Sequence, residues 1–201
     1  LGALLVTAAT GSAIYALTVA GDDGWTSPQT LITAGTAAVL YLLFGWRQQS
    51  AVSPLMDLGL LRREPVGAGM FVILIATALM VAVFFLGTFY FQQTAGLSPL
   101  ETGLLFLPIA LATMAGANLG GRLIAGAGAR TLGAVGMIVA AIGLLAPALR
   151  PTTIATTIGI SVGAFGIGAL FVVASATALG QIGPEEAGIA SGLLSTFHEF
   201  G

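Results

Sequence analysis

The feature that most constrains the fold of this chain is a series of apolar runs, separated by short polar or charged stretches. There are roughly seven runs of about twenty residues, and a helix of that length crosses the roughly 30 Å hydrocarbon layer of a bilayer. The chain is 57% hydrophobic and only 7% charged, whereas soluble domains carry about 25% charged residues. We therefore predict an all-α, polytopic membrane protein.

Prolines, glycines and charges mark where the apolar runs begin and end. The predicted membrane-spanning helices, about seven in all, cover residues 1–20, 28–46, 66–92, 99–121, 131–149 and 152–179, with the last beginning at 184. Ser27-Pro28 and Pro184-Glu185 are typical helix starts, because Ser caps free N–H groups and Pro and acidic residues suit a first turn. Residues 48–65 are predicted to form a polar loop with a short surface helix near 55–61, and residues 122–130 a short Gly/Ala-rich loop.

The arginines predict the orientation of these helices in the membrane. All six basic residues are Arg, and counting the turns places five of them on one face: Arg47, Arg62, Arg63, Arg122 and Arg130. Cytoplasmic loops of membrane proteins carry an excess of basic residues. We therefore expect these five residues on the cytoplasmic side, and Asp22, Asp23 and Arg150 on the external side.

Composition and motifs also limit the function. The net charge of −2 leaves no basic stripe, so we expect no nucleic-acid partner. We find no nucleophile–base pair, phosphate-binding loop or metal-ligand cluster, and therefore expect no enzyme, no metal site and no cofactor. His198-Glu199 begins the zinc-protease pattern HExxH, but the chain reaches Gly201 before the second His of that pattern. The lipid bilayer is the expected partner.

Glycines are concentrated within the predicted spans. Three pairs have GxxxG spacing: Gly116 with Gly120, Gly159 with Gly163, and Gly188 with Gly192. Small residues at this spacing let helix backbones approach closely in a membrane. The pattern indicates either static helix packing or helices that slide against one another. Pro108, inside the span 99–121, predicts a kink.

Several polar residues near the spans have both a structural and a functional interpretation. Glu101 ends Ser98-Pro99-Leu100-Glu101, a capping box in which Ser caps the helix and Glu bonds back to the cap's N–H. The alternative for Glu101 is proton or cation handling from the external side. Gln92 and Gln93 lie at the outer end of one span and Asn118 inside another. These three either lie at the interface or bond between helices, or they line a substrate pathway.

His198 and Glu199 form an adjacent titratable pair in an apolar helix. An ionisable side chain at the bilayer centre costs about 2.5–3.5 kcal/mol on insertion scales, so such residues are functional candidates. A role in the substrate or proton pathway and a purely structural pairing remain equal alternatives for these two side chains.

Aromatic residues cluster toward the outer half of the span 66–92. They are Phe84, Phe85, Phe89, Tyr90 and Phe91. Packing against lipid or helices, with Tyr90 in an interfacial aromatic belt, is the ordinary explanation. The more specific alternative is an aromatic wall that holds an apolar, drug-like substrate.

Four stretches, in order along nearly the whole chain, resemble the major facilitator superfamily, in particular its fourteen-helix drug/proton antiporters of the EmrB/QacA type. The first, Leu1-Gly-Ala-Leu-Leu5 with Gly24-Trp-Thr-Ser-Pro28, is similar to the extra helix pair that joins the two halves in that branch. The other three are similar to its seventh and eighth core helices, its short cytoplasmic loop and the start of its eleventh core helix: 89–108, 120–130 and 184–201.

The resemblance implies a proton-coupled secondary transporter that exports drug-like or amphipathic small molecules by alternating access. It implies a central linker helix pair at 1–47, a cytoplasmic loop at 48–65 and a C-terminal helical bundle at 66–201. The implied location is the cell membrane, as a multi-pass protein of a bacterial inner membrane. Protons, the small-molecule substrate and a six-helix N-terminal half outside this sequence are the implied partners. We therefore expect a segment of a longer protein.

One departure from the family weakens part of this inference. Where the family's cytoplasmic loop has an acid followed by a base, this chain has Ala125 and Gly126, so only Gly121, Arg122 and Arg130 remain as candidates for a conformational loop. The resemblance also assigns proton coupling mainly to the other half. A permease for sugars or other metabolites and a non-transporting helical membrane subunit remain as alternatives.

Overall fold

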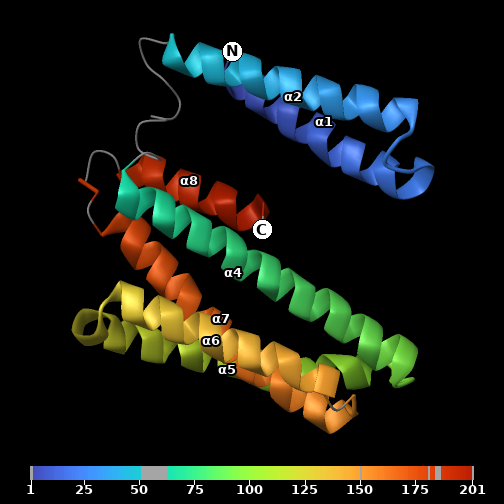
Figure 1. The fold of residues 1–201 in the computed structure, drawn as a ribbon, viewed down its shortest axis with the longest axis vertical. Helices are drawn as coiled ribbons and strands as arrows, with labels where there is room; N and C mark the ends of the chain where they lie inside the picture. The colour runs from blue at the N-terminus through green and yellow to red at the C-terminus, as the bar shows by residue number, and fades with distance from the viewer. Residues whose placement is uncertain (1, 51–62, 150, 181, 184–186, 201) are drawn as a thin grey trace. The chain divides into compact units, whose positions relative to one another are not determined.

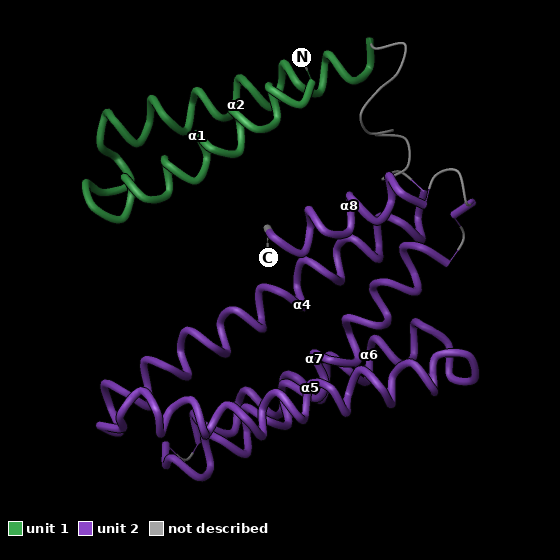
Figure 2. Tube along the Cα trace, turned by 180° about the vertical axis from the view of Figure 1, so that it is seen from behind, with its two compact units in different colours: residues 1–59 green, residues 60–201 purple. Residues whose placement is uncertain are grey.

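The computed structural model describes residues 2–50, 63–149, 151–180, 182–183 and 187–200. Within these ranges the chain is helical and contains no strand. It divides into two compact units, residues 1–59 and 60–201, which Figure 2 draws in green and purple. The predicted all-α class is confirmed.

The first unit is a hairpin of two helices, α1 (Gly2–Asp23) and α2 (Pro28–Gln49). Gly24, with φ of 92°, begins the turn between them. The Ser27 side chain accepts a hydrogen bond from the backbone N–H of Thr30 at 3.1 Å, which caps α2 as predicted. A hydrogen bond of 3.0 Å between the hydroxyls of Thr10 and Tyr41 joins the two helices.

The second unit is built around α7 (Thr153–Leu179). The helices of this unit that pack on α7 are α4 (Glu64–Phe89), α5 (Pro99–Ala127), α6 (Ala129–Leu149) and α8 (Ala187–Phe200). Of the 27 residues of α7, 13 are buried, more than in any other described helix. Figures 1 and 2 show α8 beside the first half of α4. The central helix thus holds the others in place.

Glycines allow the backbones around α7 to approach closely. A Cβ atom at Gly116 would overlap the backbone carbonyl of Phe165, and one at Gly168 would overlap that of Thr113, so α5 and α7 touch through their main chains. Gly143 of α6 is in the same kind of contact with α7, against Gly159 and Gly163. Packing is therefore confirmed for the two GxxxG pairs of α5 and α7. The pair in α8, Gly188 and Gly192, has open space around it in the described part of the chain.

Within the described residues, six helices are long and apolar enough to cross a membrane. The longest is the continuous stretch of α4 and the π-helical turn η1, Glu64–Thr94. The last predicted span is represented by α8, which has 14 described residues. Pro108 lies inside α5, which continues through it. The surface helix predicted near 55–61, the first residues of the span predicted from 184, and Arg62 and Arg150 lie outside the described residues.

Some predicted helix ends were wrong. α5 continues to Ala127, and Gly128 alone separates it from α6, so the loop predicted at 122–130 does not exist. Gly128 has φ of 78°, and this left-handed conformation reverses the chain within one residue. Arg122 is therefore a helical residue whose long side chain is exposed. Likewise α2 extends to Gln49, into the predicted loop at 48–65.

Candidate functional site

The candidate site is a cavity of about 650 Å³ in the second unit. It lies between one face of α4 with η1, one side chain of α7 and one of α8. The lining residues are Thr77, Met80, Val81, Phe84, Phe85, Thr88, Phe89, Gln92, Gln93, Phe171 and His198. A cavity of this volume is within the range of about 300–1,000 Å³ that small-molecule sites have.

The helical repeat of α4 explains why one face of it forms the wall. The lining residues recur at steps of three and four along α4, which places them in one stripe. The other side of the helix carries Ala76 and Val83, which are buried in the core with Ile167 and Leu170 of α7. One helix therefore supplies both a packed face and a face that is open to a ligand.

A π-helical turn ends this wall. Residues Tyr90–Thr94 form η1, in which the backbone N–H of Ala95 donates to the carbonyl of Tyr90 at 2.9 Å. Phe91 in this turn is fully buried, whereas Gln92 and Gln93 line the cavity. Such turns occur frequently at functional sites, because the wider turn redirects side chains.

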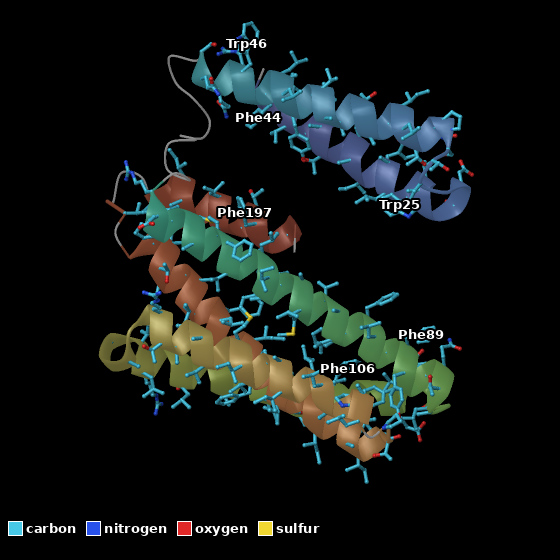
Figure 3. All side chains as sticks on the ribbon, viewed as in Figure 1. Trp25, Phe44, Trp46, Phe89, Phe106 and Phe197 are labelled. Carbon is cyan, nitrogen blue, oxygen red and sulfur yellow. The ribbon has the colours of Figure 1, made fainter. Side chains whose placement is uncertain are left out.

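The structure divides the predicted aromatic cluster between wall and core. Phe84, Phe85 and Phe89 line the cavity, and the ring of Phe84 packs against that of Phe106 with centroids 4.9 Å apart. Phe91 instead lies in the core, in an edge-to-face contact with Phe106 at 6.0 Å. Tyr90 lines a different cavity, between α4, α6 and α7. Figure 3 shows Phe89 near the end of α4.

The polar groups of the wall have free hydrogen-bonding capacity. Neither Gln92 nor Gln93 has a side-chain hydrogen bond within the described part of the protein. Thr77 is only 7% exposed, and its hydroxyl has no partner among the described residues. Because the Thr77 oxygen itself is buried, the two Gln amides are the unpartnered groups of this set that a bound molecule can reach.

His198 reaches the cavity from α8. Its ring lies 5.7 Å from that of Phe171, centroid to centroid, and its Nδ1 atom lies 3.6 Å from Oε1 of Glu199. The two side chains differ in position: His198 is 48% exposed and lines the cavity, whereas Glu199 is 84% exposed and is not part of the lining. His198 thus lines the same cavity as Gln92 and Gln93 but from the other end, because α8 packs on the first half of α4 and the two Gln side chains lie in η1. Glu199 lies beside the site.

Glu101 and Asn118 lie away from this cavity, on α5. The Ser98 backbone N–H and hydroxyl both donate to Oε2 of Glu101, at 2.8 and 2.7 Å, and the Ser98 Oγ accepts from the Glu101 backbone N–H at 3.3 Å. This confirms the predicted capping box. Asn118 is exposed and has no hydrogen bond in the described residues.

The three candidates for a conformational loop flank the connection between α5 and α6. Gly121 and Arg122 lie in the last two turns of α5, and Arg130 lies at the start of α6. Arg130 lines a second cavity of about 900 Å³, between α4, α6 and α7, together with Glu64. These residues are therefore helix-end groups.

Comparison with known proteins identifies the family. The model of the Major Facilitator Superfamily matches residues 1–201. The chain belongs to the major facilitator superfamily. The family expected from the sequence is thus confirmed. The chain is therefore a multi-pass membrane protein from a family of transporters.

Several curated relatives of this superfamily chain are resistance proteins. It is 30% identical, over its whole length, to the multidrug resistance protein Stp of Mycobacterium tuberculosis, and 29% identical over 92% of its length to the lincomycin resistance protein LmrB of Listeria innocua. It is 32% identical over 71% of its length to the tetracenomycin C resistance and export protein of Streptomyces glaucescens. The chain spans 38%, 40% and 27% of these three proteins, respectively.

The sequence did not lead us to name several of the residues that line this cavity. Thr77 and Thr88 share the helical stripe of Phe84 and Phe85, so the spacing along 66–92 contains a signal that finds them. Phe171 carries no such signal, because it reaches the cavity only through the packing of α7 on α4.

Proposed function

We propose that this chain is part of a proton-coupled exporter of drug-like or amphipathic small molecules, which works by alternating access. The observation that carries the proposal is the cavity along α4, which is lined by four Phe rings, two Gln amides without partners and His198. An apolar wall with a few polar groups is the usual composition of a small-molecule site.

The relatives support export over uptake. Their printed names are those of resistance proteins, and one is a resistance and export protein. Because the chain spans about 38% of the first relatives' length, the transport cycle belongs to a longer protein. We propose that a six-helix N-terminal half of the same protein, the bilayer, protons and the small-molecule substrate are the partners of this segment, in a bacterial inner membrane.

We assign a role to each part of the chain. Residues 1–47 are the linker helix pair between two halves, 48–65 a cytoplasmic loop and 66–201 the C-terminal bundle. The separate packing of α1 against α2 supports the first assignment. The main-chain contacts around α7 support a bundle that rocks as one body during alternating access. In that cycle Gly121, Arg122 and Arg130 mark its cytoplasmic end.

We also propose a pair of residues through which this segment takes part in proton coupling. His198 is the titratable side chain that lines the cavity in the described residues, and Glu199 is its neighbour at 3.6 Å. Both side chains can bind and release a proton, so this pair is the candidate through which this segment responds to protons. The role that we propose for this segment is a part in transport and involves no covalent chemistry.

Transport by the full-length protein tests the proposal. Inside-out vesicles that contain it should accumulate an apolar fluorescent dye when a proton gradient, acid inside, is imposed, and an uncoupler should abolish the accumulation. Vesicles from the same cells without the gene are the control. Accumulation that survives the uncoupler would refute proton coupling. Transport of sugars or other metabolites alone would favour the permease alternative, and no transport would favour a structural subunit.

A further inference from the structure

The residues of the cavity wall point to a class of substrate. This inference rests on the function proposed above. We infer that the α4 cavity selects flat, uncharged aromatic molecules that carry hydrogen-bond acceptors, and that it discriminates against aromatic cations of the same shape. The inference follows from the ring faces, the polar groups and the charges that line the cavity.

The ring faces provide surfaces for stacking. Phe85 and Phe89 are 70% and 59% exposed, so their faces are available to a bound molecule, and Phe171 lies on the α7 side of the cavity. Aromatic rings stack favourably in offset or edge-to-face arrangements. The rings of Phe84, Phe85 and Phe89 lie on successive turns of α4 and form a continuous apolar wall, which suits a flat molecule.

The polar groups of the wall are uncharged and can donate hydrogen bonds to a ligand. The amide groups of Gln92 and Gln93 have no partner in the described residues, and the hydroxyl of Thr88 also lines the cavity. An amide NH₂ offers two donors and a hydroxyl one. In a low-dielectric site these donors favour a ligand with carbonyl or hydroxyl oxygens, since unsatisfied polar groups are costly there.

The charges explain the discrimination against cations. No acidic side chain lines the cavity in the described residues. The nearest carboxylate to the lining His198 is that of Glu199, which points its Oε1 atom to Nδ1 of His198 and is largely in the open. A cation would therefore lose its hydration without gaining a dedicated counter-charge, whereas an uncharged ligand has no such cost.

A matched pair of ligands tests the inference directly. N-Methylacridone and N-methylacridinium share a flat three-ring skeleton and fluoresce, but the first is an uncharged carbonyl compound and the second a cation. Their binding to the full-length transporter in lipid nanodiscs is measured by fluorescence anisotropy. We expect the acridone to bind about tenfold more tightly, a modest electrostatic difference. Equal or tighter binding of the acridinium would overturn the inference.

Single substitutions test whether the acridone binds in the α4 cavity. Phe85→Ala should weaken acridone binding about three- to tenfold, as expected for one lost aromatic contact. Phe71→Ala is the control, because Phe71 lies on the same helix, is 62% exposed and is not part of the cavity wall. Equal losses in the two variants would place the binding elsewhere. Melting curves in nanodiscs establish that both variants are folded.

A gain-of-function variant tests whether the absence of a carboxylate from the wall causes the selectivity. Thr88→Asp adds a carboxylate to the wall and should strengthen binding of the acridinium about tenfold, since opposite charges attract strongly away from water. If the variant is folded and acridinium binding does not change, the missing acid is not the reason for the selectivity. Dye transport by the same protein in closed inside-out vesicles separates the two proposals. Export that persists with acridinium as the preferred ligand refutes the substrate class alone, and absence of any export refutes the proposed function.

Discussion

At the scale of single residues, the glycines against α7 determine how closely the helices pack. Gly116→Ala places a methyl group against the carbonyl of Phe165, and we expect a loss of about 1–3 kcal/mol, the usual cost of overpacking. Gly103→Ala is the matched control on α5, because its Cβ meets open space and Ala is the better helix former. Thermal unfolding of both variants in detergent measures the difference. Equal melting temperatures would contradict the close contact.

Single substitutions also distinguish the roles of His198 and Glu199. His198→Ala should lower dye efflux about two- to tenfold, as for one lost ligand hydrogen bond, because His198 lines the cavity. Glu199→Gln should lower efflux less, because its carboxylate lies outside the lining. Efflux rates at matched expression provide the comparison. A larger loss for Glu199→Gln would assign the functional role to the carboxylate.

At the scale of elements, the start of α5 depends on its capping box. Ser98→Ala removes the cap and should cost about 0.5–2 kcal/mol. Glu101→Gln keeps a side-chain oxygen that accepts from the Ser98 N–H, so it should preserve stability and transport. Thermal unfolding and dye efflux check both expectations. If Glu101→Gln abolishes efflux with stability intact, Glu101 handles protons or cations, and capping is not its main role.

The elements also show how far sequence reasoning reaches. Apolar runs predicted the helices, because their length is dictated by the bilayer and their caps by local chemistry, as at Ser27 and Ser98. The end of α5 was placed six residues too early, because Arg122 in an apolar run suggested a loop. Gly120, Gly121, Gly126 and Gly128 all lie near this point, and their spacing does not show that Gly128 is the one that adopts a positive φ.

At the scale of the whole molecule, the sequence predicts the candidate site only in part. Gln92, Gln93 and His198 were named as candidates separately, and nothing in their spacing places α8 beside α4. Phe171 became part of the site only when α7 was packed against α4. Helical periodicity predicts which residues share a face of one helix. It does not predict which helices meet, because that depends on contacts such as those of Gly116 and Gly143.

Orientation in the membrane is the whole-molecule property on which the assignment of external and cytoplasmic ends depends. The chain contains no Cys, so single thiols can be introduced into a cysteine-free full-length protein. Ala95, between η1 and α5, is exposed and expected outside, and Ala127, at the end of α5, is exposed and expected inside. A membrane-impermeant maleimide added to intact cells should label Ala95→Cys and leave Ala127→Cys unlabelled until the cells are permeabilised. The Arg excess on one face is the physical reason, since basic loops stay cytoplasmic. The reverse labelling pattern would invert the topology, and the direction of transport proposed for this segment would then be wrong.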